Sequence, residues 1–216
     1  MHQYAILIDG GFAKRKIGTS IQPANAADFE ALITAICHYP LLEGLRLHRV
    51  YYYDSVPLQT AHDKPLSGGK IEFANQPIAT RSQQLFDQLV KLPYVALRLG
   101  ELSFNGWELT QKKLNKANGD MIEIRHTDLK PSITQKGVDM RIGMDIAALT
   151  LKKQVQLIVL VTGDSDFVPA MKFARREGAQ LYLAPLKQNI RASMYEHSDM
   201  VLDIDFVRPA TPVAVT

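Results

Sequence analysis

The sequence has very little cysteine and no long hydrophobic segment, and both absences narrow the class of protein. Cys37 is the only cysteine among 216 residues, which excludes an internal disulfide framework and a cysteine-rich zinc site and fits a reducing compartment. The apolar runs are far shorter than the ~20 residues that a membrane-spanning helix needs. The first residues lead directly into a strand-like segment, without the basic and apolar regions of a secretory signal. We therefore expect a cytoplasmic protein with no membrane partner.

The chain also lacks the composition of disordered, collagen-like or coiled-coil proteins. Hydrophobic residues make up 46% and charged residues 22% of the sequence, close to the average for soluble globular proteins. The net charge of +3 says little by itself about binding partners. A chain of this length can form one substantial domain with its own core.

Short apolar segments alternate with helical segments along most of the chain, which predicts a single three-layer α/β domain, Rossmann-like, with a mostly parallel central sheet. We predict strands at 4–8, 45–53, 94–100, 155–161, 179–184 and 200–206, and helices at 26–39, 82–92, 138–152, 169–176 and 190–196. Two insertions interrupt the pattern. Residues 55–80 are interpreted as a long loop or lid, and residues 101–135 as either a hairpin or a helical excursion. The domain would span residues 1–208, with a flexible tail at 209–216.

Aspartates directly follow two of the predicted strands. Asp9 comes at the end of the first strand, and Asp164 and Asp166 follow the strand that ends at Val161. In an open parallel sheet, ligands bind outside the carboxyl ends of the strands, where the strand order reverses. If these two strands are neighbours at that point, three carboxylates converge there. Their mutual repulsion would be relieved by protonation or by a bound cation.

Asp139 adds a fourth carboxylate at the start of a predicted helix. Its spacing to the apolar residues Ile142, Ile146 and Leu149 places it on the buried stripe of that helix, and the N-terminal end of such a helix lies over the carboxyl ends of the strands. An anionic cluster with only oxygen ligands suits Mg²⁺ or Mn²⁺, and two such ions support in-line displacement at phosphorus. Taken singly, each aspartate also fits an ordinary turn or helix cap.

Three sequence blocks resemble the NYN domain family, specifically its LabA-like branch within the PIN-like nuclease superfamily. The blocks are Ile8-Asp9-Gly10, then Lys136-Gly137-Val138-Asp139 followed by Asp145, and finally Thr162-Gly163-Asp164-Ser165-Asp166-Phe167. The similar pieces are spread from residue 4 to about residue 185. The resemblance implies a PIN-like fold and a metal-dependent nuclease whose catalytic and metal-binding residues are the aspartates already named: Asp9, Asp139, Asp164 and Asp166.

Residues next to these aspartates are candidates for supporting roles. Asp145 matches a position that is commonly acidic in the family, but it lies roughly 120° from Asp139 around the helix, so we expect it to support the site or the helix. Thr162 and Ser165 flank Asp164, and either contact phosphate, orient a carboxylate or cap the turn. The candidates for contacts to a nucleic-acid backbone are the basic residues beside the motifs: Lys14, Arg15, Lys136 and Arg141.

The function we expect is hydrolysis of phosphodiester bonds by a ribonuclease that uses Mg²⁺ or Mn²⁺ and acts on nucleic acid, with single-stranded RNA as the favoured partner. The alternative is a catalytically weak RNA-binding or regulatory protein on the same fold. A phosphatase with an aspartyl nucleophile is a further hypothesis, but that chemistry usually needs a second aspartate where Gly11 stands. The sequence does not decide whether the substrate is RNA or DNA, whether cleavage is endonucleolytic or exonucleolytic, or whether the chain forms a homo-oligomer.

Overall fold

A computed structural model of the chain describes residues 2–115 and 121–209 and divides into two compact units. The first unit contains the residues up to 54, residues 85–99 and the residues from 138 onward, and the second contains residues 55–84 and 100–137. The second unit is therefore built from the two segments that interrupt the alternation of strands and helices. Beyond residue 209, the predicted tail lies outside the described residues. Within the described ranges, no helix is both long and apolar enough to cross a membrane.

A seven-stranded sheet has the hydrogen-bonded order β6-β5-β2-β1-β7-β8-β9. The strands are β1 (Gln3–Asp9), β2 (Arg46–Val56), β5 (Val95–Leu109), β6 (Leu129–Lys136), β7 (Leu157–Val161), β8 (Gln180–Leu183) and β9 (Met200–Val201). β1 pairs in parallel with both β2 and β7, and β7, β8 and β9 continue in parallel, while β5 and β6 are antiparallel. The chain adds strands on one side of β1 and then crosses to β7 on the other side. The strand order therefore reverses between β1 and β7, and the predicted mixed α/β, mostly parallel architecture is confirmed.

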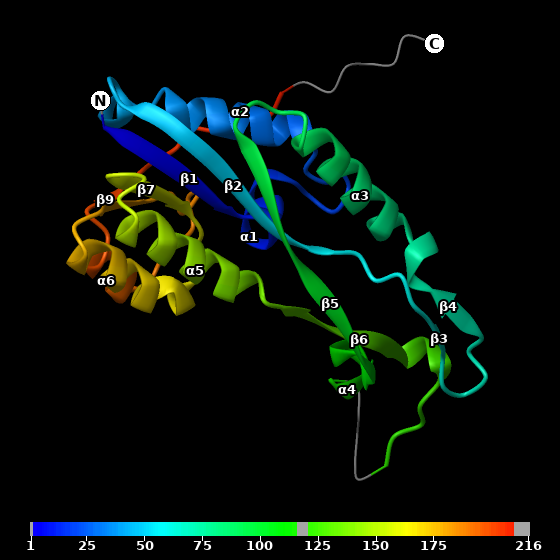
Figure 1. Cartoon of the computed structure of the whole chain (residues 1–216). Coiled ribbons are helices and arrows are strands. Elements are labelled where there is room, and N and C mark those ends of the chain that lie inside the picture. The colour runs from blue at the N-terminus through cyan, green and yellow to red at the C-terminus, as the bar shows by residue number, and fades with distance from the viewer. Residues whose placement is uncertain (1, 116–120, 210–216) are drawn as a thin grey trace, which may run out of the picture. The chain divides into compact units, whose positions relative to one another are not determined.

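Helices cover both faces of the parallel strands of the first unit (Figure 1). Tyr4, Ile6 and Ile8 of β1 share a core with α1, α2 and the end of α3, whereas Ala5 and Leu7 share a second core with α5, α6 and α7. Alternate residues of a strand point to opposite faces, so one strand serves both cores and three layers result. The helices are α1 (Gly10–Ile17), α2 (Ala26–Cys37), α3 (Pro77–Leu89), α5 (Val138–Leu151), α6 (Val168–Arg176) and α7 (Ala192–Glu196), with short 3-10 turns η1 (Pro40–Leu42) and η4 (Ser165–Phe167).

The second unit has more regular structure than the expected long loop. Its elements are β3 (Ala61–Asp63), β4 (Lys70–Glu72), η2 (Phe73–Asn75), α4 (Gln111–Leu114) and η3 (His126–Asp128), together with parts of α3 and β5 and all of β6. β3 and β4 form an antiparallel hairpin, so the interpretation of residues 55–80 as a loop is wrong. Strands of three residues are too short to show a hydrophobic period. For residues 101–135 the sequence left open a hairpin or a helical excursion. The antiparallel pairing of β5 with β6 shows that the hairpin is correct.

Aromatic packing holds the second unit together. The ring of His62 stacks on Phe104 with centroids 4.0 Å apart, and Phe104 also contacts Phe73 and Trp107. The indole N–H of Trp107 donates a hydrogen bond of 3.1 Å to the backbone carbonyl of Asp63. Aromatic side chains are large, so a few of them provide the buried apolar area that strands of three residues lack.

Two elements of the first unit differ from the sequence-based expectation. The helix α1 begins immediately after β1, where two consecutive glycines indicated a turn, because Asp9 caps it by accepting a 3.0 Å hydrogen bond from the Phe12 N–H. Gly10 is required there, since a Cβ atom would run into the Tyr53 carbonyl and the Tyr52 ring. β9 has only two residues instead of the expected seven. After the Leu202 N–H, which donates to the Leu183 carbonyl at 2.7 Å, the segment is held by side chains, with Leu202 and Ile204 buried in the first core.

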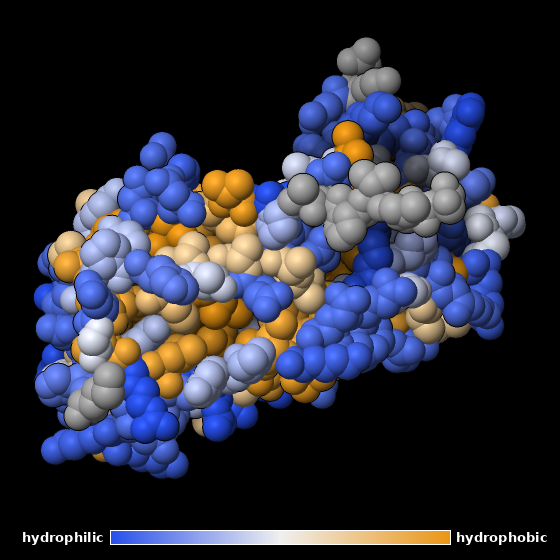
Figure 2. All heavy atoms as spheres, turned by 90° about the horizontal axis from the view of Figure 1, so that it is seen from above, coloured by the Kyte–Doolittle hydropathy of each residue, from blue (hydrophilic) through white to orange (hydrophobic). Residues whose placement is uncertain are grey.

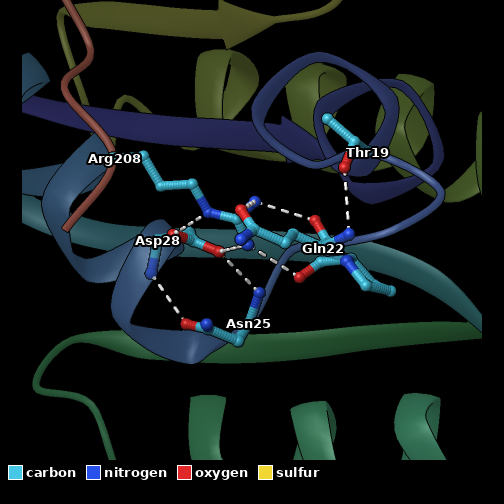
Figure 3. A network of polar contacts seen from close by, with 6 residues as sticks. Thr19, Gln22, Asn25, Asp28 and Arg208 are labelled. Carbon is cyan, nitrogen blue, oxygen red and sulfur yellow. Dashed lines mark hydrogen bonds and ion pairs between the residues drawn. The ribbon is translucent and has the colours of Figure 1, made fainter. Parts of the chain in front are cut away.

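Arg208 fastens this C-terminal segment to the start of α2 (Figure 3). Its guanidinium donates to both carboxylate oxygens of Asp28, at 3.0 and 2.9 Å, and to the backbone carbonyls of Gln22 and Pro23 at 2.8 and 2.9 Å. Asp28 is buried and belongs to a capping box with Asn25 at the N-terminus of α2. The same carboxylate therefore both caps a helix and anchors the segment around Arg208.

Not all hydrophobic residues are buried in the two cores. On the face seen in Figure 2, hydrophobic residues gather in a broad area bordered by hydrophilic ones. A groove of about 640 Å³ is lined by Ala27, Ala31 and Ala35 of α2 and by Val207. Burial in the cores thus accounts for only part of the apolar composition of the chain, as is usual for globular proteins.

Candidate functional site

Polar side chains follow the neighbouring strands β1, β7 and β8 at their carboxyl ends. Asp9 ends β1 and Asp164 follows β7, and the two strands are aligned because Ile8 pairs with Val161. Residues 184–191 connect β8 to α7. These three segments line one cleft with a volume of about 380 Å³, whose polar lining includes Asp9, Arg15, Asp164, Ser165, Asn189 and Arg191. The cleft lies at the reversal of strand order, where an α/β sheet binds its ligands.

Asp9 is held firmly in this cleft. The Phe12 N–H donates to its Oδ1 at 3.0 Å, and the Thr162 hydroxyl donates to its Oδ2 at 3.2 Å. Burial raises the pKa of Asp9, and repulsion from Asp139 adds to this, whereas both hydrogen bonds and the nearby Arg15 guanidinium act in the opposite direction. A partly desolvated carboxylate of this kind gains strongly from a cation placed beside it.

Thr162 joins the ends of β1 and β7. Its side chain is completely buried, donates to Asp9 and accepts a 3.2 Å hydrogen bond from the backbone N–H of Asp164. Asp164 in turn caps the short turn η4, because its Oδ1 accepts a 2.9 Å hydrogen bond from the Asp166 N–H. Ser165 lines the cleft beside it. Of the roles that the sequence left open for Thr162, its hydrogen bonds are those of a residue that orients a carboxylate.

Asp139 and Asp166 do not line the cleft, and both side chains are exposed. The expectation that Asp139 lies on the buried stripe of its helix is wrong: that stripe begins with Val138 and continues through Ile142. Asp139 is one residue further along, about 100° around the helix, and so reaches solvent. Burial nevertheless raises its pKa, and repulsion from Asp164 and Asp166 raises it further. Asp139 therefore interacts electrostatically with the other three aspartates, although of the four only Asp9 and Asp164 line the cleft.

The donor set suits a hard divalent cation by its chemistry. Among residues 2–115 and 121–209, no three His, Cys, Asp or Glu side chains are grouped closely enough to form a ready-made metal site. Mg²⁺ does not require such a group, since it keeps several waters and is commonly bound through one or two carboxylates together with substrate phosphate. Carboxylate oxygens that repel one another at the end of a sheet fit that mode of binding.

Asp145 is engaged in a separate contact. The Tyr53 hydroxyl donates to its Oδ2 at 2.9 Å, and Arg98 Nε donates to the same oxygen at 3.1 Å. The Arg98 guanidinium also lies over the ring of Tyr51, 5.2 Å from its centroid. Burial, followed by the nearby Asp145 charge, raises the pKa of Tyr53. Asp145 therefore ties α5 to strands β2 and β5.

A fifth carboxylate, Asp54, follows the aromatic run of β2 and was not among the predicted site residues. Its sequence signal is the same as that of Asp9, an aspartate at the end of an apolar strand segment. Asp54 is buried, pairs with Lys14 at 2.6 Å and accepts a 2.9 Å hydrogen bond from the Tyr52 hydroxyl. The charge of Lys14, a predicted nucleic-acid contact, is therefore matched by a buried carboxylate.

The other basic candidates lie in different places. Arg15 is exposed and lines the cleft, and Arg141 is half-buried on α5. Lys136 is exposed at the end of β6, in the second unit. Sequence reasoning missed Asn189 and Arg191, whose only signal was a run of polar residues after a short strand.

Comparisons with known proteins agree with this architecture. The family model of the NYN domain matches residues 4–205, nearly the whole chain. A crystal structure of a protein of unknown function from Vibrio parahaemolyticus is similar in fold, with a TM-score of 0.50, 14% sequence identity, and coverage of 94% of this chain and 93% of that chain. No curated protein matches the sequence. The structural neighbour supports the fold alone, and the family model carries the assignment.

Proposed function

Because the chain belongs to the NYN domain family, a family of PIN-like nucleases, we propose that it is a metal-dependent ribonuclease that hydrolyses phosphodiester bonds in single-stranded RNA. The observation that supports this most directly is the cleft at the β1–β7 switch point, where Thr162 connects Asp9 and the backbone of Asp164. Its membership of the LabA-like branch stays a prediction, as do a single domain over residues 1–208, a cytoplasmic location and a homo-oligomer.

In this proposal, the catalytic and metal-binding residues are Asp9, Asp139, Asp164 and Asp166. A bound Mg²⁺ or Mn²⁺ would supply a more acidic water and stabilise charge on the phosphate oxygens. The chain itself contributes orientation: Thr162 holds the Asp9 carboxylate, and the η4 turn holds Asp164. The exposed carboxylates of Asp139 and Asp166 add negative charge that favours a divalent cation over a monovalent one.

The pKa directions agree with a site that is completed by a cation. Burial raises the pKa of Asp9 and of Asp139, and both are raised further by neighbouring aspartates. A positive charge at the carboxyl ends of β1 and β7 would reverse that electrostatic effect and favour the ionised forms. Nothing in the stability of a parallel sheet requires acidic residues to be gathered there.

The proposal is tested by incubating the purified chain with end-labelled single-stranded RNA in Mg²⁺ or Mn²⁺. We expect cleavage that a chelator abolishes and that Asp164→Asn slows by at least about a hundredfold, since a catalytic metal contributes several kcal/mol of charge stabilisation. Asp87→Asn is the matched control, because Asp87 is exposed on α3 and does not line the cleft. It should cleave at the wild-type rate.

Two results would contradict the proposal. Undiminished cleavage in chelator, or by Asp164→Asn, would exclude a metal held by these aspartates. Binding of RNA by the wild type without any cleavage would favour the alternative of an RNA-binding or regulatory protein on this fold. Parallel reactions on single-stranded DNA of the same sequence would decide between the two nucleic acids.

A further inference from the structure

The cleft that contains Asp9 and Asp164 also carries two arginines. Arg15 comes from α1, and Arg191 comes from the segment between β8 and α7. Both side chains are exposed, and neither forms an ion pair with a described residue. Arg175 and Arg208 of the same unit are both paired with aspartates. Neither cleft arginine is therefore neutralised by an ion pair within the described residues, and both are available to an anionic ligand.

Arg191 is presented by a well-anchored segment. The chain leaves β8 with a 2.9 Å hydrogen bond from the Ala184 N–H to the Leu160 carbonyl, and Gln188 then donates from its side chain to the Gly163 carbonyl at 3.2 Å. Gly163 has no room for a side chain there, because a Cβ atom would run into Gln188 and Phe12. On the other side of Arg191, Met194 is fully buried in the core. The position of Arg191 relative to Asp164 is thus set by direct contacts between the two loops.

The cleft is lined by side chains of both charges. Asp9 and Asp164 supply negative charge, and Arg15 and Arg191 supply positive charge. A group that binds at the aspartates through a cation and at the arginines directly must itself be anionic on more than one atom. Successive phosphates of a nucleic-acid backbone have this property. Arginine suits phosphate particularly well, because its planar fork donates two parallel hydrogen bonds.

We propose that Arg191, together with Arg15, binds the phosphate next to the scissile one, so that the β8–α7 segment positions the RNA in the cleft. This rests on the proposed nuclease function. The cleft volume of about 380 Å³ falls at the low end of the range of ligand sites, roughly 300–1,000 Å³, which suits one nucleotide unit rather than a long stretch of chain. Asn189, exposed in the same wall, offers an amide to the ribose or base of that nucleotide.

The experiment measures binding separately from cleavage. A short fluorescein-labelled oligouridylate is titrated with protein in chelator, and fluorescence anisotropy gives the affinity at several salt concentrations. Arg191→Ala is compared with Arg46→Ala, which removes the same charge from an exposed residue at the amino end of β2, away from the carboxyl-end cleft. Cleavage of the same RNA is then measured in Mn²⁺ for each variant.

We expect Arg191→Ala to weaken binding about 10- to 100-fold, the usual cost of losing a hydrogen bond to a charged group. The slope of log affinity against log salt should become shallower by about 0.7, the value for one phosphate contact on a single strand. Arg191→Lys should recover part of the affinity, since it keeps the charge without the fork. Arg46→Ala should match the wild type in both measurements.

The outcomes separate this inference from the nuclease proposal. If the wild type cleaves RNA and Arg191→Ala binds as tightly as Arg46→Ala, the role of Arg191 is overturned and the nuclease proposal stands. If Arg191→Ala loses affinity but the wild type never cleaves, the nuclease proposal fails and Arg191 remains an RNA contact. If the wild type neither binds nor cleaves, both are overturned.

Discussion

Replacing Arg208 by alanine should destabilise the protein far more than a surface substitution does. Arg208 donates two hydrogen bonds to the Asp28 carboxylate and two to backbone carbonyls at the start of α2 (Figure 3). The Asp28 side chain is 1% exposed, and the Arg208 side chain is 23% exposed. In Arg208→Ala, the buried carboxylate would keep one donor, the Asn25 N–H at 2.9 Å.

The magnitude follows from this geometry. Removing one partner of a fully buried pair costs about 3–5 kcal/mol, and the partial exposure of Arg208 lowers this to about 2–4 kcal/mol because water can reach the vacated space. For a chain of this length, each kcal/mol lowers the midpoint of thermal unfolding by about 2–4 °C. The variant should therefore melt roughly 4–16 °C below the wild type.

Urea unfolding followed by circular dichroism measures the free energy, with Arg176→Ala as the matched control. Arg176 pairs with the adjacent Glu177 and lies over the Phe173 ring, 5.7 Å from its centroid, but its side chain is 74% exposed, so its loss should cost about 1 kcal/mol. The double variant Asp28→Asn, Arg208→Ala should regain part of the loss, because an amide is cheaper to leave buried than a charge. If Arg208→Ala lowers the free energy of unfolding no more than Arg176→Ala does, the role of the buried pair is refuted.

Three further predictions concern the site. Thr162→Val should slow RNA cleavage by about tenfold or more, since it removes the hydrogen bond to Asp9 and the acceptor for the Asp164 N–H, whereas Thr162→Ser should keep most of the rate; equal rates would exclude the orienting role. Because burial raises the pKa of Asp9, the native state holds this proton more tightly than the unfolded chain, so stability falls as pH rises from the ordinary carboxyl pKa through the raised one. In chelator at neutral pH, the urea midpoint of Asp9→Asn should therefore be no lower than that of the wild type. At a pH below the ordinary carboxyl pKa, the two midpoints should no longer differ for this reason. A clearly lower midpoint for Asp9→Asn at neutral pH would contradict this. Asp145→Ala should cost about 1–3 kcal/mol of stability by leaving the Tyr53 hydroxyl without its acceptor, and cleavage per folded molecule should be unchanged; a large loss of rate without a loss of stability would give Asp145 a catalytic role.

The ends of β1 and β7 could be predicted because their signals are local. A short apolar run followed by Asp9, and a second followed by Asp164, each mark a buried strand and its carboxyl end. If the two strands are neighbours, the rule that α/β sheets bind ligands at the reversal of strand order brings the two aspartates together. The structure meets this condition, because β1 pairs in parallel with β7.

Other features depend on contacts that no local pattern reports. The glycines after Asp9 indicate a turn, yet they begin a helix that Asp9 caps, and Gly10 is needed there because the backbone passes close to Tyr52 and Tyr53 of the neighbouring strand. The buried stripe of α5 starts at Val138 rather than Asp139, a shift of one residue that apolar spacing did not resolve. The second unit is built on aromatic contacts between residues far apart in the sequence, such as His62 with Phe104.

The basic residues show most clearly why composition could not identify the substrate contacts. Lys14 and Arg15 are adjacent in the sequence and equivalent in charge, yet Lys14 pairs with the buried Asp54 while Arg15 lines the cleft. A buried carboxylate needs a cation beside it whatever the protein binds, so Lys14 serves the fold first. Arg191, which no motif singled out, lies in the cleft because the β8–α7 segment packs against Gly163. A basic side chain that pairs with a buried carboxylate, as Lys14 does, is therefore not available for a phosphate, whereas Arg15 and Arg191 are. The number of basic residues in a segment does not reveal this difference.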